Sequence, residues 1–169
     1  MSLASRPILT GMTLLTGAAA VLALWLSGAI AAGEDAHSAE KRRYIAAAEA
    51  VCQEAGQAAS TEGNPPDSPR AAVAELRRSA AAMTQAAARL GTLRPPRPDG
   101  DAIQRQFVLP ANQLAARMRS LAGQAEEELA EGRGAEAVAV VERSLASDEA
   151  ETALRSFAHA YGLSICAGE

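Results

Sequence analysis

Two cysteines, Cys52 and Cys166, limit the folds open to this chain more than any other feature of the sequence. Both follow an apolar N-terminal stretch of the kind that directs export, and two cysteines in an exported chain most simply form one disulfide. Such a bond closes a loop of over a hundred residues, which in the chain-entropy model contributes up to about 4.7 kcal/mol. The alternatives are two free buried thiols or a redox pair, although the Cys-x-x-Cys spacing typical of redox pairs is absent.

Alanine is the most abundant residue, with 42 copies among 169 residues, whereas aromatic residues make up only 3%. Alanine has the highest intrinsic helix propensity, and the chain has few runs of the β-branched and aromatic residues that form strands. The composition therefore predicts an all-α fold. Because an alanine side chain buries little apolar area, we expect a thin core that gains much from a covalent link.

The first 33 residues form a separate segment by composition. Arg6 is the only charged residue in it, and residues 8–32 are mostly apolar. As a helix these 25 residues would span about 37 Å, enough to cross the hydrocarbon core of a bilayer. The sequence Ala29-Ile30-Ala31 also fits the small-x-small pattern at which signal peptides are cleaved. Residues 1–33 are therefore predicted to be either a transmembrane anchor, which the length favours, or a cleaved signal peptide.

The charges on the two sides of this segment give competing signals of orientation. Lysine and arginine favour the cytoplasmic side; Arg6 precedes the segment, whereas the basic run at residues 41–43 follows it. We place the C-terminal part outside the cytoplasm, because the signal-like N-terminus and the cysteine pair agree on that side. The predicted location is the cell membrane, single-pass with an extracytoplasmic C-terminal domain, or secretion if the signal is cleaved. A cytoplasmic C-terminal part is the alternative.

Residues 34–166 are predicted to form one extracytoplasmic helical domain, which begins with a short polar linker over residues 34–39. Beyond the linker, apolar residues recur at steps of three and four, which indicates amphipathic helices that pack on one another. Clusters of glycine and proline separate these helices, and Ser68 followed by Pro69 is a typical helix start. The predicted helices cover residues 38–60, 69–91, 102–131 and 135–161.

Two of these predicted helices carry an irregularity. Asp101 would cap the third helix, and Pro110 falls inside it; because proline has no N–H to donate, we expect a kink or break near residues 105–109. In the fourth helix, the apolar residues before and after Ser147 would lie on nearly opposite faces. That helix is therefore either interrupted around residues 147–149 or contacts different neighbours with its two halves.

Four helices joined by short connections favour an antiparallel up-down-up-down four-helix bundle, in which the first and last helices are neighbours. Gly162 would end the last helix, and residues 163–166 would then run back along the first helix. The bundle therefore makes a bond between Cys52 and Cys166 geometrically reasonable.

Three short sequences give the chain a resemblance to a known group of proteins. They are YIAAAEAVCQEA at residues 44–55, LRPP at 93–96 and AYGLSIC at 160–166. The chain resembles small alanine-rich exported proteins of high-GC Gram-positive bacteria, which are secreted or membrane-anchored, often lipoproteins, and functionally uncharacterised. The resemblance implies a disulfide-closed helical bundle beside a membrane and supplies no catalytic residues. Because this chain lacks the cysteine of a lipoprotein signal, residues 8–32 are its only possible anchor.

Residues able to carry chemistry are sparse. His37 and His159 are the only histidines, and their positions favour a solvated side chain and a helix-capping one. Glu34 and His37 have the Glu-x-x-His spacing of di-metal bundles, but a second such motif is absent. Met83 or Met118 could ligate a haem together with His159, although helical periodicity already explains both methionines as core residues. We therefore predict no catalytic residue, no metal site and no cofactor.

Two hypotheses about function follow. After residue 33 the chain carries 20 acidic and 15 basic residues, which argues against nucleic-acid binding. The leading hypothesis is a non-enzymatic exported or membrane-anchored domain that contacts an unknown envelope protein or serves as a structural module. If the N-terminal segment is uncleaved, residues 8–32 contact the membrane. The alternative is a carrier of a small ligand, metal or haem in the bundle interior.

Overall fold

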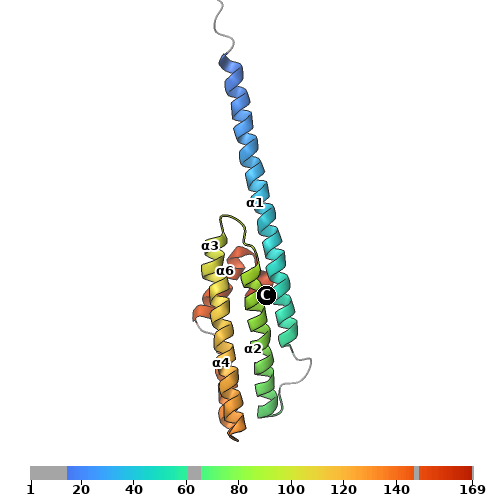
Figure 1. Ribbon diagram of the computed structural model, residues 1–169, viewed down its shortest axis with the longest axis vertical. Helices are drawn as coiled ribbons and strands as arrows, with labels where there is room; N and C mark the ends of the chain where they lie inside the picture. The colour runs from blue at the N-terminus through green and yellow to red at the C-terminus, as the bar shows by residue number, and fades with distance from the viewer. Residues whose placement is uncertain (1–14, 61–65, 147–148, 169) are drawn as a thin grey trace, which may run out of the picture. The chain divides into compact units, whose positions relative to one another are not determined.

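The computed structural model describes residues 15–60, 66–146 and 149–168, with side chains described from residue 37 onward. All regular structure in these residues is helical (Figure 1), which confirms the predicted all-α fold. The chain divides into two compact units, residues 1–39 and 40–169. The core and the sites discussed below lie in the second unit.

The first helix is longer than predicted. Helix α1 (Leu15–Ala59) continues through residues 34–39, so the predicted polar linker is wrong. These six residues contain neither glycine nor proline, and the single glycine before them costs only about 1 kcal/mol within a helix. Of the predicted anchor or signal peptide, residues 1–14 lie outside the described residues, as do the side chains of residues 15–36. In the described part of the chain, no helix is both long and apolar enough to cross a membrane.

The second predicted helix is confirmed together with its start signal. Helix α2 (Pro69–Thr92) has Pro69 in its first turn, where the missing N–H would have no helical partner. The Ser68 hydroxyl accepts a hydrogen bond from the backbone N–H of Ala71 at 3.2 Å, which satisfies one of the free donors of that turn.

The third helix has its irregularity where the proline predicts one. A helical run comprises α3 (Gly100–Ile103), the π-helical turn η1 (Gln104–Val108) and α4 (Leu109–Ala130). The π turn ends just before Pro110, whose ring and missing N–H are incompatible with regular α-helical bonding to the preceding turn. The predicted cap at Asp101 is wrong: this residue lies in the first turn, and Asp99 occupies the cap position. The Asp99 side chain instead accepts a hydrogen bond from Tyr161.

The fourth predicted helix is interrupted after Ser144, and its halves also contact different neighbours; residues 147–148 of the predicted break lie outside the described residues. Helix α5 (Gly134–Ser144) and helix α6 (Glu149–Tyr161) belong to separate hydrophobic clusters. Helix α5 packs on α2 and α4 in a cluster that we call the alanine core: Val73, Leu76, Ala80, Ala122, Ala125, Ala137 and Val140.

Helix α6 packs in a second cluster, which we call the aromatic core. Its buried members come from α1, α2, the α3–η1 run, α6 and the residue after Gly162: Tyr44, Ala48, Val51, Leu90, Ile103, Phe107, Val108, Leu154, Ala158 and Leu163. All four Phe and Tyr rings of the chain meet here, with centroids 6.3 Å apart for Phe107–Phe157, 5.7 Å for Phe157–Tyr161 and 6.3 Å for Tyr44–Tyr161. Rings at such distances add to the stability gained from burial alone.

The predicted disulfide is present. Cys52 of α1 is bonded to Cys166 of the short helix α7 (Ser164–Ala167), 114 positions later. Gly162 ends α6 with a φ of 94°, a left-handed conformation that favours glycine. The turn buries Leu163 completely in the aromatic core and brings the tail back to α1.

Removal of the disulfide should destabilise the protein markedly. We expect Cys52→Ser to lower the free energy of unfolding by roughly 2–5 kcal/mol, because the unfolded chain loses a restraint across a long loop. Chemical denaturation measures the loss, and non-reducing peptide mapping by mass spectrometry should find a linked Cys52–Cys166 peptide in exported protein. Cys166→Ser should be equally destabilised, and the double variant no more so. Free thiols in exported wild-type protein would contradict the assignment.

Candidate functional site

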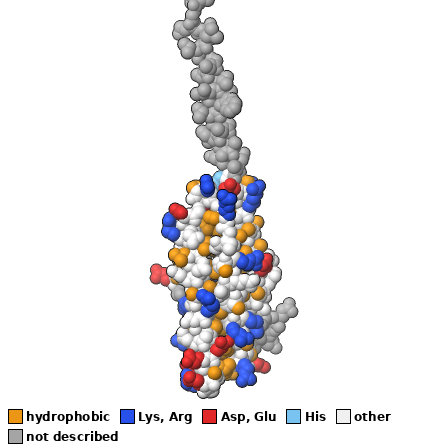
Figure 2. Space-filling view, in the orientation of Figure 1, with side chains coloured by type: hydrophobic (Ala, Val, Ile, Leu, Met, Phe, Trp, Pro, Cys, Tyr) orange, Lys and Arg blue, Asp and Glu red, His pale blue; other side chains and the backbone are white. Residues whose placement is uncertain are grey.

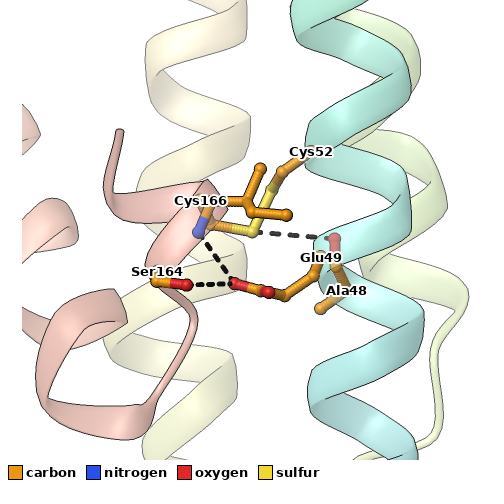
Figure 3. Close-up of a disulfide and its surroundings, with 6 residues drawn as sticks. Ala48, Glu49, Cys52, Ser164 and Cys166 are labelled. Carbon is orange, nitrogen blue, oxygen red and sulfur yellow. Dashed lines mark hydrogen bonds between the residues drawn. A yellow bond between two sulfur atoms is a disulfide. The ribbon is translucent and has the colours of Figure 1, made fainter. Parts of the chain in front are cut away.

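The C-terminal tail is held against α1 by more than the disulfide (Figure 3). The Glu49 carboxylate accepts hydrogen bonds from the backbone N–H of Ile165 at 2.8 Å and from the Ser164 hydroxyl at 3.3 Å. The Cys166 sulfur lies 3.6 Å from the Ala48 carbonyl oxygen. These contacts and the disulfide, which we call the clasp, give Cys52 and Cys166 a structural role.

A wide groove lies where the start of the second unit meets the proline-rich connection between α2 and α3. It has a volume of about 940 Å³, and we call it the arginine groove. One wall comes from α1 and the other from the loop and the start of α3: Glu40, Arg43, Tyr44, Ala47, Leu93, Arg94, Pro95, Pro96, Arg97, Pro98, Gly100 and Asp101.

Three arginines dominate the charge of this groove. Arg43, Arg94 and Arg97 are exposed, and none has a carboxylate within ion-pair distance among the residues that the structure describes. The groove also holds Glu40 and Asp101, the latter 3.9 Å from the guanidinium of Arg105. Figure 2 shows Lys and Arg side chains at several places along the visible face of the second unit, with Asp and Glu among them. The arginine groove therefore keeps a positive local charge in a chain whose net charge is −4.

Tyr44 belongs both to the groove and to the aromatic core, where its ring contacts that of Tyr161. Tyr44 is only 4% exposed, and its buried hydroxyl has no hydrogen-bond partner among the described residues. Burial raises the pKa of Tyr44 to about 12. The Tyr161 hydroxyl donates a 2.7 Å hydrogen bond to Asp99, and burial, followed by that bond and the Asp99 charge, raises the pKa of Tyr161 further. The Lys41 ammonium lies 4.2 Å from the centre of the Tyr161 ring, a cation–π contact.

A second concavity, which we call the apolar cleft, lies on the α7 side of the aromatic core. Its volume is about 390 Å³, within the range of small-molecule sites. Apolar side chains from α1, α2, the η1–α4 run, α6 and α7 line most of it, among them Cys52, Met83, Leu90, Phe107, Leu154 and Ile165. Gly56 opens onto this cleft, and a Cβ there would meet nothing within 4 Å. One side of the disulfide therefore forms part of an apolar surface.

Comparisons with protein-family models, with curated proteins and with solved structures found no match. The groove and the cleft are therefore interpreted from their own geometry. The resemblance to alanine-rich exported proteins stays a prediction.

The other residues considered from the sequence do not come together in one site. His37 is half-buried in α1, and His159 is exposed in the last turn of α6. Met83 lines the apolar cleft, whereas Met118 packs against the alanine core. The side chain of Glu34 lies outside the description. Within the described residues, no group of three or more His, Cys, Asp or Glu side chains could hold a metal ion.

Sequence reasoning missed both the clasp carboxylate and the groove. Glu49 is one glutamate among many in an amphipathic pattern, so no signal distinguishes it. The glycine and proline cluster at residues 93–100 predicts a helix connection, and nothing in the periodicity shows that Arg94 and Arg97 line one groove with Arg43. The available signal was the coincidence of a basic run at 41–43 with a second pair of arginines in a proline-rich loop.

The two tyrosine hydroxyls should have opposite effects on stability. Tyr44→Phe removes a buried hydroxyl that has no partner, so the free energy of unfolding should stay unchanged or rise by up to about 2 kcal/mol. Tyr161→Phe removes a hydrogen bond to a carboxylate and should cost roughly 1.5–3 kcal/mol. Chemical denaturation of both variants at neutral pH makes the comparison. A loss above 2 kcal/mol in Tyr44→Phe would contradict the assignment of its hydroxyl.

Both tyrosines also predict a loss of stability in alkali. Their folded-state pKa values lie above the ordinary value of 10, so their contribution is complete below pH 10. It is lost as the pH rises through 10 toward 12, because only the unfolded chain then releases these protons readily. Absorbance of tyrosinate against pH should show neither residue ionising near pH 10 while the protein is folded.

Proposed function

We propose that this chain is a non-enzymatic, exported helical-bundle domain of the cell envelope, anchored by residues 8–32 or secreted after cleavage. The observation that carries the proposal is the Cys52–Cys166 disulfide, which uses both cysteines of the chain. Such bonds persist in oxidising compartments and are rare in the cytosol. The apolar segment before the domain supplies the means of export.

The proposal regards residues 40–169 as an antiparallel four-helix bundle whose fourth helix is interrupted. Support comes from the contact between Tyr44 of α1 and Tyr161 of α6, which makes the first and last helices neighbours. The alanine core joins α2, α4 and α5 in the same way. In this interpretation α5 and α6 together form the fourth helix of the bundle. The break between them lets α5 pack in the alanine core and α6 in the aromatic core.

The domain acts by contact, with the arginine groove as its most distinctive surface. The groove is open and lined by charged and proline residues, as a contact surface would be. An envelope protein or a structural role beside the membrane agrees with the resemblance to alanine-rich exported proteins.

A second candidate function is the carriage of a small apolar ligand in the apolar cleft. The observation that favours it is the cleft itself, about 390 Å³ of mostly apolar lining beside the clasp. A cavity of this size and lining suits an acyl chain or another small apolar molecule.

Reporter fusions at the C-terminus test the location. Alkaline phosphatase, which is active only outside the cytoplasm, should be active, and a fluorescent protein that folds only in the cytoplasm should stay dark. Deletion of residues 8–32 should reverse the pattern. Activity of the cytoplasmic reporter alone on the full chain would contradict export. N-terminal sequencing of the exported product then distinguishes an anchor from a cleaved signal.

Filling the apolar cleft tests the second function. Gly56→Leu places an apolar side chain in the cleft, and the replacement of a helical glycine should itself stabilise α1 by roughly 1 kcal/mol. If a ligand is carried, native mass spectrometry of purified protein should detect a bound molecule that this variant loses. Gly123→Leu is the matched control, because Gly123 is an exposed helical glycine outside the cleft with similar free space. A wild-type protein that carries no small molecule contradicts this second function.

A further inference from the structure

We infer that the arginine groove binds a phosphate group attached to a hydroxyl-bearing moiety. The bilayer supplies this chemistry in anionic lipid headgroups such as that of phosphatidylglycerol, and solution supplies it in free phosphate esters of polyols. This ligand class would bind at the surface through which the domain is proposed to act. Binding to a lipid headgroup rests on the proposed location beside a membrane, whereas binding to a free phosphate ester does not.

The arginines provide the first argument. Arg43 comes from α1 and Arg94 and Arg97 from the loop, so three guanidinium groups without ion-pair partners among the described residues line one groove. Glu40 and Asp101 line the same groove but balance only two of these three charges, so a bound anion would offset the excess positive charge. One guanidinium can bind both oxygens of a carboxylate. A phosphate has more acceptor oxygens and more negative charge, so it can bind several guanidinium groups at once. The set therefore suits a phosphate better than an acidic side chain.

The size and composition of the groove indicate what the phosphate is attached to. A lone phosphate would fill only a small part of about 940 Å³, a volume typical of sites for much larger ligands. Glu40 and Asp101 would repel a second anionic group but accept hydrogen bonds from hydroxyls. A polyol joined to a phosphate satisfies both kinds of side chain.

The loop wall is restrained before any ligand arrives. Pro95, Pro96 and Pro98 limit the backbone on either side of Arg94 and Arg97, and Pro96 is buried. The hydrogen bond from Tyr161 holds Asp99 at the end of the loop. A wall that is already ordered loses less conformational entropy on binding.

Chain connectivity places the groove within reach of a bilayer surface. Glu40 follows Ala32 by only eight residues, which even a fully extended chain spans in about 29 Å. If residues 8–32 lie in a membrane, the groove residues of α1 are therefore confined to the neighbourhood of the headgroups.

The test uses the purified full chain and two matched triple variants. R43Q/R94Q/R97Q removes the groove charges, and R70Q/R78Q/R119Q removes three exposed arginines outside the groove. Far-ultraviolet circular dichroism and intact disulfides establish that both variants fold, and the single variant R97Q gives a smaller perturbation. The solution arm is a calorimetric titration of detergent-solubilised protein with glycerol phosphate and with inorganic phosphate. The bilayer arm compares the melting temperature in phosphatidylcholine nanodiscs with and without phosphatidylglycerol.

We expect glycerol phosphate to bind at least tenfold more weakly to the groove variant, and within twofold of wild type to the control variant. A phosphatidylglycerol-dependent rise in melting temperature that is lost only in the groove variant identifies the lipid as the source. Solution binding without that rise identifies a free phosphate ester. Absence of phosphate binding in both arms, equal losses in both triple variants, or tighter binding of inorganic phosphate overturns the inference. Because the solution arm is independent of location, a chain that is not exported would fail the fusion test without changing this result.

Discussion

The attachment of the tail to α1 is the constraint on which the rest of the second unit depends. The Cys52–Cys166 bond fixes the end of the chain, and Glu49 pairs with the donors of the final turn beside it. Between this clasp and α6 lies only the turn at Gly162, so fixing the tail also fixes the last turn of α6. The side chain of Leu163, directly after this turn, is fully buried in the aromatic core. A long-range covalent bond thus adds to the packing of α6 in the aromatic core.

The two cores divide the packing in a way that explains the interrupted fourth helix. The alanine core uses small side chains, which let α2, α4 and α5 approach closely but bury little area each. The aromatic core contains most of the large side chains, and it lies where α1, α6 and the η1 turn meet. A single straight helix from residue 134 to 161 would present its later apolar face on nearly the opposite side from the earlier one. The break between α5 and α6 lets each half face the core that its side chains match.

Local sequence patterns predict most of the helices, but they do not predict contacts between segments that are far apart in the sequence. Ser68, Pro69 and Pro110 act on their own turns of backbone, so the start of α2 and the irregularity of the third helix were open to prediction. The cysteine pair could be assigned because only one pairing exists. The predicted linker over residues 34–39 is wrong because polar residues alone do not end a helix, and these six include neither glycine nor proline. The role of Asp99, and hence the misplaced cap, depends on Tyr161, 62 positions away, which no local pattern reveals.

The clasp and the arginine groove are joined through one residue. Tyr161 ends α6 five positions before Cys166, its hydroxyl donates a hydrogen bond to Asp99 at the end of the proline-rich loop, and its ring contacts Tyr44, which lines the groove from α1. Tyr161 therefore contacts both a groove residue of α1 and the residue between Pro98 and Gly100 of the loop. The aromatic core thus has two roles, because the contacts of Tyr161 that stabilise α6 also restrain Tyr44 and the end of the loop beside the groove. A thin alanine-rich bundle can keep a defined charged surface in this way, since its few large side chains gather where that surface is built.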